Sequence, residues 1–191
     1  MTGILGILAA AMLLAPLAAL HAADSPARIF HAQGEMAGEV TQTTVILQSR
    51  LTASPGLEDG DVAGAAGWGR FEYADSADFS GPNETEWLEA EADNDYIIRT
   101  QVRGLQPGRS YVYRLVFGVE RSRTQTGPVR TFKTLPAADR PVPVRFVVGN
   151  CMNYAFFFHG PQGDGRNARA DVTDRRLGYP ALESIRRLEP D

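Results

Sequence analysis

The chain holds one cysteine, Cys151, and one lysine, Lys133, among its 191 residues. A single thiol excludes an intrachain disulfide. The formal net charge is −4 and the arginines are scattered, so the chain has no basic cluster that could neutralise phosphates. These shortages exclude a disulfide-stabilised scaffold and a general nucleic-acid-binding protein.

Charged residues are also missing from residues 3–20, a stretch rich in leucine, isoleucine and alanine. Small residues follow it, and polar sequence begins at Asp24. This order predicts a signal peptide at residues 1–23, cleaved after Ala22 or Ala23. We therefore expect a secreted or periplasmic protein without stable membrane insertion. No lysine or arginine precedes the apolar core, which leaves two alternatives: a start codon further upstream, or an uncleaved segment that acts as an anchor.

The lone thiol of Cys151 is informative in this setting. Exported proteins meet an oxidising environment, where a free thiol is readily lost. Three fates follow from the residue type alone: burial, pairing with another chain, or binding to a metal.

Short alternating runs separated by turn residues follow the predicted signal peptide, a pattern typical of an all-β domain. No helical periodicity interrupts them. Residues 24–135 have the size of one β-sandwich of the fibronectin type III or immunoglobulin type. The predicted strands are residues 44–51, 67–73, 87–92 and 96–102, one beginning near Tyr111, and a closing strand at 129–134.

A Leu-x-Pro-x-x-x-Tyr pattern joins two of these strands, formed by Leu105, Pro107 and Tyr111. It resembles the corner of fibronectin-like sandwiches, where a tyrosine hydroxyl ties the preceding turn to the core. We expect Tyr111 to hold that structural role, and we assign it no catalytic duty.

The character of the sequence changes after residue 135. Residues 136–143 contain three prolines and predict an extended linker. The apolar run 144–148 predicts a buried strand that ends in the turn carrying Cys151, as at the start of an α/β domain. A helix is predicted from Pro180, with a loop at 161–174. One strand and one helix cannot bury a sheet, so we expect residues 144–191 to be an incomplete domain.

Several segments, in this order, resemble the alkaline phosphatase D family, whose members carry a β-sandwich ahead of a metallophosphoesterase domain. These segments are residues 34–50, 105–113, 132–136, 144–154 and 179–191. The fold class is accordingly mainly β, with a sandwich followed by the first strand and helix of an incomplete α/β metallophosphoesterase domain. Asn150 and Met152 depart from the family's usual serine and glutamine, and the loop 156–178 is longer than expected.

The resemblance implies an exported, metal-dependent phosphatase or phosphodiesterase that acts on phosphate esters as a monomer. It also implies iron and calcium as cofactors, with Cys151 as a thiolate ligand to ferric iron. A buried apolar thiol is the alternative role for this residue. The other metal ligands and the catalytic residues would lie beyond Asp191, so this chain alone is expected to be inactive.

We assign no catalytic or metal-binding role to the other polar residues that could suggest one. His159 is expected to be a solvated loop residue. Asp164, Asp171 and Asp174 lack the spacing of a calcium-binding loop. Asn83 begins a glycosylation acceptor pattern, but with bacterial export it is expected to lie in an ordinary loop.

Two functions from different classes remain at this stage. The chain is either the amino-terminal part of a metal-dependent phosphoesterase, or a secreted fibronectin-like binding or adhesion module without catalysis. The residues that follow Asp191 in the gene would separate them. An apolar strand ending in Gly-Asp supports the enzyme, whereas a second sandwich or a stalk contradicts it.

Overall fold

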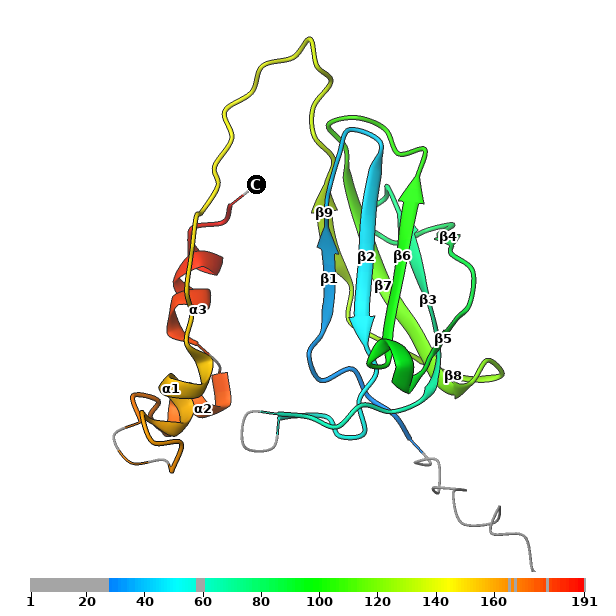
Figure 1. Cartoon of the computed structure of the whole chain (residues 1–191). Coiled ribbons are helices and arrows are strands. Elements are labelled where there is room, and N and C mark those ends of the chain that lie inside the picture. The colour runs from blue at the N-terminus through cyan, green and yellow to red at the C-terminus, as the bar shows by residue number, and fades with distance from the viewer. Residues whose placement is uncertain (1–27, 58–60, 165, 167, 178, 191) are drawn as a thin grey trace, which may run out of the picture.

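The computed structural model describes residues 28–57, 61–164, 166, 168–177 and 179–190. The predicted signal peptide lies outside these residues. Figure 1 shows a two-layered sandwich of strands, followed by an extended segment and three short helices. In the part of the chain that the structure describes, no helix is long and apolar enough to span a bilayer.

The sandwich consists of two antiparallel sheets. The smaller sheet has the order β1-β2-β6, with β1 (Glu35–Gly38), β2 (Thr44–Arg50) and β6 (Ile97–Arg103). The larger sheet has the order β4-β3-β7-β8, while β5 pairs with β3 and β9 pairs with β7. Its strands are β4 (Asn83–Glu84), β3 (Gly67–Ala74), β5 (Leu88–Ala90), β7 (Ser110–Glu120), β8 (Arg123–Thr126) and β9 (Arg130–Lys133). A single 3₁₀ turn, η2 (Ala92–Asn94), separates β5 from β6.

The core lies between the two sheets because the buried side chains alternate along the strands. In β2, Val45 and Leu47 have no exposed surface, whereas their neighbours in sequence are partly exposed. Successive side chains of a strand point to opposite faces, so one face of each sheet supplies the core. The sheets approach closely at Gly69, where a Cβ atom would overlap the side chain of Ile98.

The tyrosine corner forms as the sequence predicts. The backbone N–H of Gln106 donates to the hydroxyl of Tyr111 across 2.8 Å. The Tyr111 side chain is buried, and its ring stacks on Phe132 of β9 with 5.3 Å between ring centroids. The corner thus joins the turn before β7 to the last strand of the sandwich.

Thr134 completes this corner where the chain leaves the sandwich. It is 1% exposed, and its hydroxyl donates to the carbonyl of Gln106 across 2.7 Å. The same oxygen accepts from the backbone N–H of Arg109 across 2.9 Å. Next in sequence, the N–H of Leu135 donates to the carbonyl of Thr41. The chain therefore departs from a point held by both sheets.

Most of the predicted strands agree with the structure within a few residues, and β1, β4 and β8 were not predicted. β4 has two exposed residues, and β8 is the polar sequence RTQT. Such segments pair through their backbones without an apolar face, so they carry no alternation that a pattern could reveal.

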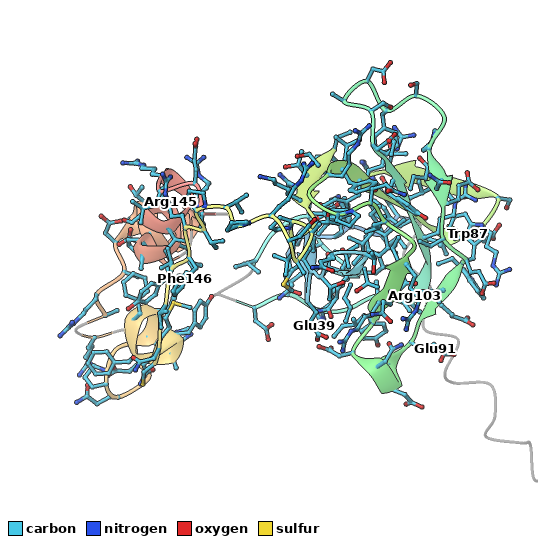
Figure 2. The ribbon with its side chains drawn as sticks, turned by 90° about the horizontal axis from the view of Figure 1, so that it is seen from above. Glu39, Trp87, Glu91, Arg103, Arg145 and Phe146 are labelled. Atoms are coloured by element: carbon cyan, nitrogen blue, oxygen red, sulfur yellow. The ribbon has the colours of Figure 1, made fainter. Side chains whose placement is uncertain are left out.

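The predicted buried strand at 144–148 is wrong in the structure, where these residues are extended and form no strand. Phe146 is 75% exposed and Val148 is 82% exposed. A buried strand needs neighbours on both edges and helices on its faces, and in the described structure this segment joins no β-ladder. Figure 2 places Arg145 and Phe146 beside the helices and away from the sandwich.

Three helices follow: α1 (Tyr154–His159), α2 (Val172–Leu177) and α3 (Pro180–Arg187). The predicted helix from Pro180 is confirmed, with proline in the first turn. The sequence predicted loops where the structure has helices α1 and α2, so that prediction is wrong. Asp171 and Asp174 explain α2, because each carboxylate accepts a backbone N–H of the other residue, which is a reciprocal helix cap.

We predict that Tyr111→Phe lowers the free energy of unfolding by about 1–2 kcal/mol, because the N–H of Gln106 loses its acceptor while the ring contacts stay. Urea titration followed by circular dichroism measures this change. Tyr73→Phe is the matched control, since no hydrogen bond of the Tyr73 hydroxyl to a described residue is present. Equal stability of Tyr111→Phe and the unsubstituted chain would contradict the role of the hydroxyl.

Candidate functional site

Cys151 lies between the extended segment and α1, and its side chain is exposed. Its backbone adopts a left-handed conformation with φ of 51°, which is uncommon for a residue other than glycine. Of the three fates expected from the sequence, burial does not match the structure. Pairing with another chain and metal binding stay predictions.

The loop that carries Cys151 is attached to α1 by Asn153. The side-chain oxygen of Asn153 accepts the backbone N–H of Phe156 across 2.8 Å and so caps the helix. Inside the helix, Phe158 is buried and its ring lies 4.4 Å from that of Tyr154. The ring of Phe157 lies 4.6 Å from that of Tyr179, just ahead of α3. Aromatic contacts therefore hold α1 against the start of α3.

His159 ends α1 and lines a shallow hollow. The other residues of the hollow are Asn153, Ala155, Phe156, Gly160, Pro161, Gln162 and Gly163. Cys151 is not among them, so the structure does not bring the cysteine and this histidine into one pocket.

The three aspartates that lack calcium-loop spacing accept hydrogen bonds from backbone N–H groups near them in sequence. Asp164 accepts the N–H of Arg166 across 2.9 Å, and Asp171 and Asp174 cap α2 as described above. None of them is directed at Cys151 by a contact in the structure.

An iron ion would suit the Cys151 thiolate, because soft sulfur ligands bind iron well. A protein site nevertheless needs several donors. Within residues 28–190, as far as they are described, no group of three His, Cys, Asp or Glu side chains could hold a metal ion. The described residues thus supply one candidate ligand to an iron centre, and they do not complete it.

A second cluster of ionisable residues lies in the sandwich and was not predicted. Glu35 at the start of β1 has a fully buried side chain, with 0% exposed. Its Oε1 lies 2.9 Å from Nδ1 of His31, and its Oε2 lies 3.3 Å from Nε of Arg130. The sequence signal was weak: His31 lies four residues before Glu35, but Arg130 lies 95 residues after it and in the other sheet.

The electrostatics of this cluster follow from its burial and its partners. Burial alone would raise the pKa of Glu35, but hydrogen bonds and charge from His31 and Arg130 outweigh it and hold the pKa below its usual value. Burial, together with the charge of Glu35, raises the pKa of Tyr113 to about 12. The carboxyl is therefore ionised and the phenol neutral at neutral pH.

Two antiparallel sheets packed face to face, closed by a tyrosine corner, define a β-sandwich of the fibronectin type III class. Residues 18–136 match the family described as PhoD-like phosphatase, N-terminal domain. Because this match covers more than half of the chain, the chain belongs to the PhoD-like phosphatase family through this domain.

Solved structures provide further similarities. A structure described as PhoD is 27% identical, with a TM-score of 0.48, and the match covers 60% of this chain and 21% of that chain. The sensor domain of the anti-sigma factor RsgI4 from Pseudobacteroides cellulosolvens is 16% identical over 60% of this chain and 99% of its own, with a TM-score of 0.41. A human fibronectin type III domain is 13% identical, with a TM-score of 0.39, and the match covers 56% of this chain and 85% of that domain. No curated protein matches the chain.

We predict that the Cys151 thiol reacts with one equivalent of a soluble disulfide reagent in the native chain, at a rate close to that in urea. The reason is that the side chain is exposed, and access is one determinant of thiol reactivity. The chain is first treated with a reductant and a chelator, and Cys151→Ser provides the blank. A thiol that reacts only after denaturation would contradict its exposed position.

Proposed function

We propose that this chain is the amino-terminal part of an exported, metal-dependent phosphoric ester hydrolase, an alkaline phosphatase or phosphodiesterase. Membership of the PhoD-like phosphatase family carries this proposal, because the matched residues 18–136 span the described sandwich. The chain spans 21% of the length of the PhoD structure that it matches. Activity, substrate and localisation of the whole protein accordingly belong to the proposal.

The proposed domain organisation follows the boundaries expected from the sequence. Residues 1–23 are a signal peptide, 24–135 the sandwich domain, 136–143 a linker and 144–191 the start of a metallophosphoesterase domain. The hydrogen bonds of Thr134 support a boundary near residue 135, since they end the sandwich there. The exposed apolar side chains of residues 144–148 support a larger second domain, in which a parallel sheet would bury them.

In this proposal, Cys151 is a thiolate ligand to iron, and calcium ions complete the centre. The support is the exposed position of the thiol directly after an extended apolar segment. Bound metals would supply Lewis acidity and an activated oxygen nucleophile for attack on the phosphorus. The contribution of this chain is to present the sulfur on a turn fixed by the Asn153 cap. We assign no catalytic residue within it.

The substrate proposed for the whole protein is a phosphate ester, and the proposed state is a monomer without a nucleic-acid scaffold. The alternative is a secreted binding or adhesion module. A sandwich alone is compatible with both, because one fold hosts many functions. The family match favours the hydrolase.

We predict no turnover of p-nitrophenyl phosphate or of a bis-p-nitrophenyl diester by this chain, with or without added iron and calcium, because the described residues do not complete a metal centre. Release of p-nitrophenol measures the rate. Turnover that Cys151→Ser abolishes would contradict the expectation that the fragment is inactive.

A longer protein that includes this chain tests the proposed ligand directly. We expect Cys151→Ser to reduce its bound iron, measured by elemental analysis of the purified protein. Asn150→Ser is a matched control in the same turn that leaves the sulfur in place. Unchanged iron in Cys151→Ser would remove this residue from the centre.

A further inference from the structure

The buried carboxylate of Glu35 connects the first and last strands of the sandwich. Glu35 begins β1 in the smaller sheet, and Arg130 begins β9 in the larger sheet. The side chain of Glu35 is fully buried, whereas that of Arg130 is 50% exposed. The ion pair therefore reaches from the protein surface into the space between two sheets that share no backbone ladder.

His31 lies against the second carboxylate oxygen of Glu35. Its Nδ1 lies 2.9 Å from Oε1 of Glu35, and neither atom makes a hydrogen bond of good geometry to a described residue. The contact is an ion pair when the imidazole is protonated. The imidazole ring is held edge-on against Phe117 of β7, with 4.8 Å between ring centroids.

The surroundings of Glu35 offer the carboxylate no substitute partner. Gly127, ahead of β9, makes the space, since a Cβ atom there would overlap Oε1 of Glu35. From β7 the titratable neighbour is Tyr113, which stays neutral. From β2 the residue opposite Glu35 is the uncharged Ser49, whose hydroxyl donates to the carbonyl of Gly34. Among the described residues, His31 and Arg130 are thus the side chains within ion-pair distance of Glu35.

We propose that His31, Glu35 and Arg130 form an acid-sensitive latch that fastens β1 to β9 and releases this edge of the sandwich when Glu35 takes up a proton. A neutral carboxyl no longer attracts the guanidinium of Arg130, and it leaves this cation at the edge without a counter-ion. Strand β9 continues directly into Thr134 and the proline-rich segment, so the latch lies where the chain leaves the sandwich.

The direction of the pH dependence follows from the lowered pKa of Glu35. A carboxyl with a lowered pKa in the folded state contributes stability that is present above its unfolded pKa, near 4.5. That contribution is lost as the pH falls through the lower folded value. The latch is therefore closed at neutral and alkaline pH and opens in acid.

Amide hydrogen exchange of the chain between pH 3 and pH 7, corrected for intrinsic exchange rates, tests the latch. We expect the protection of β1 to be constant from neutral pH down to about pH 5 and then to fall by up to about tenfold per pH unit. Protection of β6 and of the centre of β7 should persist where β1 has opened. Simultaneous loss of protection in β1 and β6 would overturn the proposal, because it would report global unfolding.

Two substitutions separate the latch from general acid sensitivity. Arg130→Gln removes the half-exposed cation and brings the folded pKa of Glu35 closer to its unfolded value, so β1 protection should be lower at neutral pH and should fall less in acid; unchanged protection at neutral pH together with an unchanged loss in acid would overturn the proposal. Glu35→Gln should lower β1 protection at neutral pH and remove its dependence on acid. Arg99→Gln is the matched control, because it breaks an exposed ion pair with Glu39, where the nitrogen and oxygen lie 3.2 Å apart. It should leave both the protection of β1 at neutral pH and its loss in acid unchanged.

Discussion

The packing of apolar side chains between the two sheets is the contact on which the arrangement of the strands depends. The residues at its centre have no exposed surface and come from both layers: Val45, Leu47 and Ile98 from the smaller sheet, and Phe71 and Leu115 from the larger. Burial of apolar area contributes roughly 25 cal/mol per Å². Since side chains alternate along a strand, a slip of one residue would turn this set to solvent. The register of the strands that carry an apolar face, such as β2, β3 and β7, is therefore set by the core.

Two polar contacts close this core at its edges. At the corner, the hydroxyls of Tyr111 and Thr134 satisfy backbone groups of the turn before β7. At the other site, the buried carboxylate of Glu35 is paired with Arg130 and lies against His31. Buried polar groups cost free energy unless they are paired. Both sites therefore favour the one arrangement of strands in which these groups meet their partners. Both also involve the end of the sandwich sequence, from which the segment carrying Cys151 continues.

The sandwich and the segment after it were predictable to different degrees. Strands such as β2 and β7 have an apolar face within their own sequence, and a local pattern is enough to find them. The segment 144–148 has strand-like composition, yet it is extended and exposed. A strand of a parallel sheet is stabilised by neighbours distant in the sequence, so its composition cannot decide whether it pairs. Helix α1 was missed because its support is the Asn153 cap and ring packing against Tyr179.

The sequence by itself determined the sandwich class and the tyrosine corner, because both depend on residue type and spacing over short stretches. Cys151 became a candidate ligand through the resemblance to the alkaline phosphatase D family. Only the tertiary structure decided that the thiol is exposed, that His159 lines a hollow to which Cys151 does not contribute, and that Glu35 is buried between His31 and Arg130. The physical reason is distance along the chain. His31, Glu35 and Arg130 meet because two sheets pack together, and such a contact leaves no periodic trace in the sequence.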